Sequence, residues 1–265
     1  MKAKACFRYQ ILDLRWPVLV YYLVILAITL LTALSLGNFS VVGSAGEMTV
    51  REMAEANHTI LSGLTGASVV FVFIVGLNSF TENFRFGLQN GVSRKTVFLS
   101  RIYTAGATAL FMGLVDQLMH TMLSWIGSAT SSRWISVSLF QQIFPKTFEN
   151  PVQGFFLSVV FGFCLLFLAA NLGYAIVMVF YRLKTLGKIL VGAGVPAALI
   201  FGIPAIKGLD TLYFGERLRA FARVTLQPFL KFAFGTPASC LVSLLVLGVL
   251  MALVDWLLLR RAIVR

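Results

Sequence analysis

The chain has 265 residues, of which 58% are hydrophobic and only 12% carry a charge, and its mean hydropathy is +0.88. Soluble domains carry about 25% charged residues, so this composition excludes an ordinary soluble protein and indicates one that lies in a lipid bilayer. The formal net charge of +12 is expected to reflect membrane topology and contact with anionic lipids, not binding of nucleic acid.

Before the first apolar segment, residues 1–16 are predicted to form an amphipathic helix that lies in the membrane interface. The apolar positions are Phe7, Ile11 and Leu14, and the basic positions are Lys4, Arg8 and Arg15. Pro17 suits the first turn of a helix and is expected to begin the first membrane span.

Six apolar segments are long enough to cross a bilayer core of about 30 Å, which takes about 20 helical residues. Segments such as 17–36 and 243–259 do not alternate apolar with polar residues, so helices are expected and not the strands of a β-barrel. The chain is predicted to be one all-α membrane domain, residues 1–265. The expected spans cover residues 17–36, 60–80, 102–127, 154–181, 189–206 and 237–259.

Basic residues indicate the orientation of these spans, because lysine and arginine gather on the inner side of a membrane. With the N-terminus inside, fourteen of the 22 basic residues fall in inner segments and eight in outer ones. The acidic residues of the outer segments are Glu47, Glu52, Glu55, Glu149, Asp210 and Glu216. Both termini are therefore predicted to be cytoplasmic.

The segment between the second and third spans, residues 81–101, is dense in charge. Thr81 is expected to cap a short helix, which the sequence Asn90-Gly91 ends because glycine adopts the left-handed conformation at little cost. Ser93 is then expected to cap the helix that enters the third span. This cytoplasmic turn would display Arg94 and Lys95 at its bend. It would also expose two aromatic side chains, Phe84 and Phe86, one turn or less from Leu88.

A few polar residues are expected inside the spans, where a carboxylate costs about 2.5–3.5 kcal/mol and therefore faces the protein interior. Asp116 stands one helical turn before His120. One interpretation of this pair is a proton relay or a substrate contact. The favoured interpretation is a hydrogen bond from Asp116 to His120 or Gln117 that holds helices together.

Two further polar positions are interpreted as structural. Asn171, in the fourth span, is expected to join helices through hydrogen bonds. Asp255, near the end of the last span, is expected to form an interfacial ion pair with Arg260 and Arg261.

The fifth expected span, residues 189–206, contains three glycines and two prolines. Proline removes a backbone hydrogen bond and kinks a helix, so this span has two interpretations. It either packs tightly against neighbours through small residues, or it forms a hinge or a re-entrant path. The following residues, 207–235, are predicted to be an outer amphipathic surface helix or a re-entrant pair.

The motifs of several enzyme classes are missing from the sequence. It has no HExxH zinc motif, no GxSxG nucleophile motif and no GxxxxGK[ST] phosphate-binding loop. The chain is therefore predicted not to be an enzyme, to hold no metal or cofactor of its own, and not to hydrolyse a nucleotide.

The sequence FRFGLQNGVSRKT, residues 84–96, resembles the loop between the second and third spans in ABC transporter permeases of the type-2 exporter class. The layout of six spans, an amphipathic N-terminus and an outer segment before the last span is similar to that family as well. In that family this loop contains the coupling helix, which docks on a separate ATP-binding subunit. The residues that the resemblance assigns to coupling are Glu82, Phe84, Arg85, Phe86, Leu88, Asn90, Gly91, Ser93, Arg94 and Lys95.

The resemblance implies the permease subunit of an ATP-driven exporter in a bacterial cell membrane. Its partners would be two ATP-binding subunits, which bind ATP and Mg²⁺, and a second permease that is identical or homologous. The implied substrate is amphipathic or lipophilic, such as a peptide, bacteriocin, drug or lipid. The alternative is a proton-coupled secondary transporter that uses Asp116 and His120 and needs no ATPase.

Overall fold

A computed structural model describes the arrangement of most of the chain. The described residues are 2–35, 59–61, 63–80, 84, 87, 89–129, 134–145, 150–183, 187 and 232–260. The expected fifth span, 189–206, and residues 207–231 of the segment after it lie outside these ranges. The interpretations given to them stay predictions.

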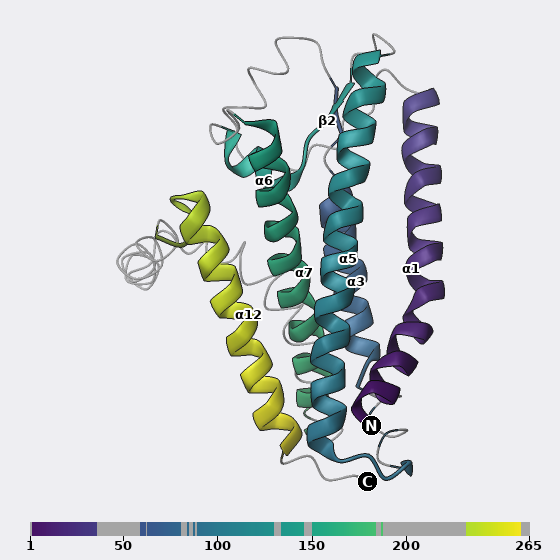
Figure 1. Ribbon diagram of the computed structural model, residues 1–265, viewed down its shortest axis with the longest axis vertical. Helices are drawn as coiled ribbons and strands as arrows, with labels where there is room; N and C mark the ends of the chain where they lie inside the picture. The colour runs from purple at the N-terminus through teal and green to yellow at the C-terminus, as the bar shows by residue number, and fades with distance from the viewer. Residues whose placement is uncertain are drawn as a thin grey trace, which may run out of the picture.

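The described chain is a bundle of long helices (Figure 1). They are α1 (Lys2–Ser35), α3 (Leu64–Asn78), α5 (Arg94–Ala129), α7 (Pro151–Arg182) and α12 (Pro237–Arg260). All of these except α3 are long and apolar enough to cross a membrane. Four such helices indicate a multi-pass membrane protein, whereas the count of six spans and the sidedness stay predictions.

The helix α3 is shorter than the span expected over residues 60–80. It has 15 residues and therefore spans about 22 Å at 1.5 Å per residue. The residues before it form the strand β1 (Thr59–Leu61), which pairs in parallel with β2 (Trp134–Ser136). The helix begins later than predicted because these residues pair with a partner more than seventy positions away, which local hydropathy does not reveal.

The N-terminal residues are part of α1, and the prediction that a helix begins at Pro17 is wrong. The position of residues 1–16 in the membrane interface stays a prediction. Pro17 lies inside α1. The first turns of α1 lean toward α5, as Figure 1 shows, and Gln10 accepts a hydrogen bond of 2.9 Å from Thr104. A proline bends a helix without ending it when both flanking segments stay packed or hydrogen-bonded. The expected apolar side, Phe7, Ile11 and Leu14, is half-buried and flanks Gln10.

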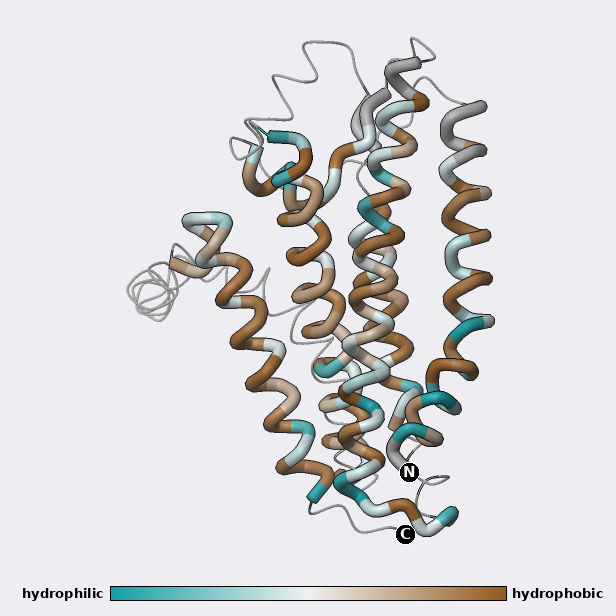
Figure 2. The backbone as a smooth tube through the Cα atoms, viewed as in Figure 1, coloured by the Kyte–Doolittle hydropathy of each residue, from teal (hydrophilic) through white to brown (hydrophobic). Residues whose placement is uncertain are grey.

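The core forms around α7, which packs against α3, α5 and α12. The helices α3 and α7 approach each other where glycines face backbone: a Cβ on Gly173 would lie 2.4 Å from the Phe73 oxygen. Buried side chains such as Val72, Met112 and Leu166 fill one shared cluster of this core. Large apolar side chains elsewhere on α1 and α12 are exposed, and Figure 2 shows hydrophobic residues dominating the middle of these helices. Exposed apolar helix surface is expected where a protein faces lipid.

The segment between α5 and α7 contains the short helix α6 (Leu139–Ile143). Ser138 begins α6 with a capping box, accepting a hydrogen bond from the Gln141 backbone while the Gln141 side chain accepts one from the Ser138 backbone. Phe140 is buried against Phe161 of α7.

The helix α6 lies at one end of the bundle. The first turn of α1, the start of α5 and the last turn of α12 lie at the other end, called here the hairpin end (Figure 1).

Candidate functional site

The turn before α5 has the bend that the sequence predicts. Gly91 has φ +67°, in the left-handed region that favours glycine, and the Val92 N–H donates to the Gly87 carbonyl over 2.9 Å. Ser93 then begins α5, because its hydroxyl accepts a hydrogen bond of 3.2 Å from the Thr96 N–H. The predicted stop at Gly91 and the predicted cap at Ser93 are confirmed.

Phe84 is not displayed on this turn, and that prediction is wrong. Its side chain is 3% exposed and stacks on Phe80 with ring centroids 5.1 Å apart. The Phe84 N–H donates to the Phe80 carbonyl, which turns the ring back into a cluster with Tyr174 and Leu259. An aromatic ring that can reach a core gains more by burial than by exposure to water. Glu82, Arg85, Phe86 and Leu88 lie outside the described residues.

Among the described residues of the turn, Arg94 and Lys95 are exposed cations, as predicted. Arg94 also donates to the Arg260 carbonyl at the end of α12, over 3.3 Å. Arg182, at the end of α7, donates to the carbonyl of Leu258, two residues before Arg260 in α12. Arginines suit this position because the last carbonyls of a helix lack internal partners and carry partial negative charge. The end of α12 is thus tied to α5 and α7.

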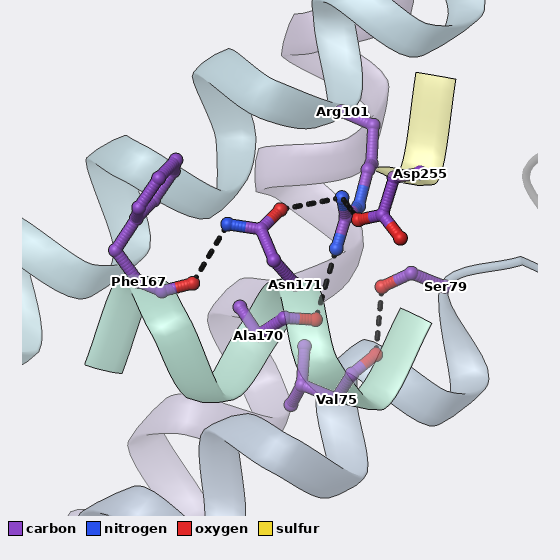
Figure 3. Close-up of polar contacts among 7 residues, drawn as sticks. All are labelled: Val75, Ser79, Arg101, Phe167, Ala170, Asn171 and Asp255. Carbon is purple, nitrogen blue, oxygen red and sulfur yellow. Dashed lines mark hydrogen bonds and ion pairs between the residues drawn. The ribbon is translucent and has the colours of Figure 1, made fainter. Parts of the chain in front are cut away.

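Two turns after Arg94, Arg101 occupies the centre of a buried polar cluster (Figure 3). It is 5% exposed, and Asp255 of α12 is fully buried. One terminal nitrogen of Arg101 lies 2.9 Å from Asp255 Oδ2 and 2.7 Å from Asn171 Oδ1. The other donates to the Ala170 carbonyl over 2.9 Å. The guanidinium thereby joins α5, α7 and α12 at one point.

An aromatic ring also lies against the charge of Arg101. The Arg101 guanidinium lies over the Tyr174 ring, 3.8 Å from its centroid, in a cation–π contact. The Asn171 amide donates to the Phe167 carbonyl over 2.8 Å, which fixes its oxygen toward the arginine. A cavity of about 30 Å³ beside Arg101 and Thr104 has room for about two water molecules.

Sequence reasoning placed this cluster only in part. The prediction that Asn171 joins helices is confirmed. The prediction that Asp255 pairs with Arg260 and Arg261 is wrong, since its partner is Arg101; Arg261 lies outside the described residues. Arg101 lies two turns after the exposed Arg94, on the same face of the helix, so its spacing does not predict burial. Arg101 is buried because α12 packs across α5.

A second polar cluster lies farther along α5, toward the end opposite the hairpin. Asp116 is 4% exposed and accepts a hydrogen bond of 2.9 Å from the Tyr22 hydroxyl of α1. His120 Nδ1 lies 2.7 Å from Ser136 Oγ, and its Nε2 lies 3.4 Å from Thr65 Oγ1. The favoured prediction of a hydrogen bond from Asp116 to His120 or Gln117 is therefore wrong. The two side chains share one face of α5 but meet different neighbours, α1 on one side and β2 on the other.

Tyr22 and Ser136 were missed by sequence reasoning. A tyrosine within an otherwise apolar span was the available signal for Tyr22, because a buried hydroxyl needs a polar partner. Ser136 had no comparable signal. Among the described residues, no group of three His, Cys, Asp or Glu side chains could hold a metal ion.

Comparison with protein-family models, curated proteins and solved structures found no match for this chain.

Proposed function

We propose that the chain is the permease subunit of an ATP-driven ABC exporter that moves an amphipathic or lipophilic substrate across the cell membrane. In this proposal a separate ATP-binding subunit supplies the energy. Two copies of that subunit act with this chain and a second permease. The hairpin end faces the cytoplasm. The ATP and Mg²⁺ are bound by the partner.

The observation that carries the proposal is the capped bend at Gly91 and Ser93. It presents Arg94 and Lys95 to solvent at the end of the bundle where α1 begins and α12 ends. Its buried side is anchored, since Gly87 packs on Val97 and Val97 belongs to the same cluster as Phe84. A bend that is exposed on one side and fixed to the core on the other suits the docking of a second protein.

The contacts beyond the bend give a physical route from such a docking event into the bundle. Arg94 and Arg101 lie on one continuous helix, about 10 Å apart along its axis at 1.5 Å per residue. Arg94 contacts the end of α12, and Arg101 contacts both α12 and α7. A displacement of the bend would therefore move three helices together.

Reversing the charge of the bend tests the proposal. The double substitution Arg94→Glu and Lys95→Glu is expected to abolish co-purification of an ATP-binding subunit, identified by mass spectrometry through its Walker A peptide. The matched control, Lys4→Glu with Arg8→Glu, makes the same charge change on exposed residues at the same end. Retention of the subunit by the control but not by the bend variant supports the proposal. Equal retention by both would contradict it.

The buried Asp116 and His120 favour a second candidate, a proton-coupled secondary transporter, because both lie deep in the bundle and line one polar crevice. The two candidates differ in their energy source. Transport that survives ATP depletion and stops with a protonophore would favour the second candidate. Transport that stops with ATP depletion while the proton gradient is held would favour the first.

A further inference from the structure

The two buried carboxylates of the bundle have contrasting environments. Asp255 faces Arg101 at 2.9 Å, and this is the one ion pair found in the part of the chain that the structure describes. Asp116 is also buried, but its Oδ1 receives only the neutral Tyr22 hydroxyl. Its Oδ2 has no hydrogen-bond partner among the described residues, although Ser68 lies near the carboxylate. A buried ionised carboxylate requires a compensating positive charge, and no described lysine or arginine supplies one here.

A small crevice opens beside Asp116, between α3, α5 and α7. Its volume is about 10 Å³, the room taken by one water molecule or one small ion. The polar side chains that line it are Thr65, Asp116, Gln117, His120, Ser138 and Ser158. Five of these six offer an oxygen atom.

The composition of this lining selects the kind of ligand. Hard cations such as sodium, magnesium and calcium prefer oxygen ligands. Calcium takes about six to eight oxygen ligands and magnesium usually keeps several of its waters, and a crevice of about 10 Å³ has room for neither shell. A single carboxylate surrounded by hydroxyl and amide oxygens matches a single positive charge. His120 does not compete, because both of its ring nitrogens already lie against hydroxyls, those of Ser136 and Thr65.

The size of the crevice favours the smaller monovalent ion. Gly113 and Gly162 let α5 and α7 approach until a Cβ on Gly113 would lie 3.1 Å from the Phe163 backbone nitrogen. Phe140 and Phe161 close the crevice on its apolar side. Helices packed this closely leave little room to expand around a larger ion such as potassium.

We propose that this crevice binds one sodium ion, with the Asp116 carboxylate as the charged ligand and the oxygens of Gln117, Thr65, Ser138 and Ser158 as neutral ligands. The ion would join α3, α5, α7 and α6 at the end opposite the hairpin, as Arg101 joins α5, α7 and α12 near it. The inference goes beyond ATP-driven export, since it requires no partner subunit.

Thermal unfolding of the purified full chain in detergent tests the proposal. Sodium chloride is titrated against choline chloride at constant ionic strength and constant pH, and potassium chloride is titrated in parallel. A ligand that binds only the folded state raises the unfolding temperature in a saturable way. We expect a saturable rise with sodium and a much smaller one with potassium. Direct binding of ²²Na⁺ is expected to reach one ion per chain.

Single substitutions test which residues the sodium-dependent stabilisation requires. Asp116→Asn is expected to abolish the sodium-dependent rise. Ser158→Ala, which removes one neutral ligand, is expected to weaken sodium binding about tenfold. Ser100→Ala is the matched control, because Ser100 is a buried serine of α5, the helix that carries Asp116, and it does not line the crevice. It is expected to keep the wild-type response.

Three results would overturn the proposal. The first is an unfolding temperature that does not respond specifically to sodium, together with no ²²Na⁺ binding. The second is an unchanged sodium response in Ser158→Ala, which remains decisive even if Asp116→Asn does not fold. The third is stabilisation that follows acidification and is indifferent to sodium, which would mean that Asp116 holds a proton instead.

Discussion

Replacing Arg101 by methionine is expected to destabilise the folded protein by about 3–5 kcal/mol, the cost of leaving a buried charge without its partner. Methionine keeps an unbranched apolar stem but removes the cation that faces Asp255 and the donors to Asn171 and Ala170. Three polar groups inside an apolar bundle would then lose their partner at once. The measurement is chemical or thermal unfolding of the purified chain in detergent.

A double-mutant cycle separates the ion pair from the packing of the arginine stem. Asp255→Asn removes the carboxylate while keeping a side chain of the same shape. Combined with Arg101→Met, it is expected to be less damaging than the sum of the two single changes, because no charge is left buried. Arg94→Met serves as the exposed control and is expected to change stability little. Additive effects in the cycle would show that Arg101 and Asp255 are not coupled.

The second large effect is expected at the contact between α3 and α7. Gly173→Ala places a Cβ 2.4 Å from the Phe73 carbonyl oxygen and 3.0 Å from the Leu77 nitrogen. Both neighbours are backbone atoms that cannot rotate away, so the helices must separate. Overpacking of this kind typically costs about 1–3 kcal/mol, and the cost should show as a lower unfolding temperature.

Gly66 provides the matched control for this prediction. It lies in α3, and a Cβ there would meet nothing within 4 Å. Gly66→Ala is expected to be neutral or to stabilise by up to about 1 kcal/mol, because alanine loses less backbone entropy than glycine in a helix. If Gly173→Ala and Gly66→Ala behaved alike, the close approach of α3 and α7 would be wrong.

Local features of this fold could be predicted from the sequence. Apolar segments of about 20 residues identify α1, α5, α7 and α12, since helix length and hydropathy are properties of one segment. The bend at Gly91 and the cap at Ser93 could also be predicted from the sequence, because a left-handed glycine and a capping hydroxyl act within four residues.

Features that depend on distant segments could not be predicted. Asp255 pairs with a residue 154 positions away, and Asp116 accepts a hydrogen bond from one 94 positions away. Phe84 was expected on a short helix that exposes it, yet its ring packs against Phe80 and the α7 core. In each case the local pattern gives the chemistry of the side chain, whereas the packing of helices determines its partner.

The long helix α5 connects the exposed bend, the buried ion pair and the polar crevice. Arg94 lies at its first turn, Arg101 follows about 10 Å along, and Asp116 lies about 33 Å from Arg94 along the same axis at 1.5 Å per residue. Each of the three contacts a different neighbour: the end of α12, the cluster on α7 and α12, and α1. One helix therefore spans from the exposed bend to the polar crevice near the opposite end.

The most direct measurement of the central claim is photo-cross-linking from the bend in membranes of the cell that makes the chain. A photoreactive amino acid at position 95 is predicted to give an adduct with an ATP-binding subunit, recognised by its Walker A peptide. The same amino acid at position 4, also exposed at the hairpin end, is predicted to give little or none. No adduct from position 95, or equal adducts from both positions, would contradict the claim that this bend receives ATP-driven motion.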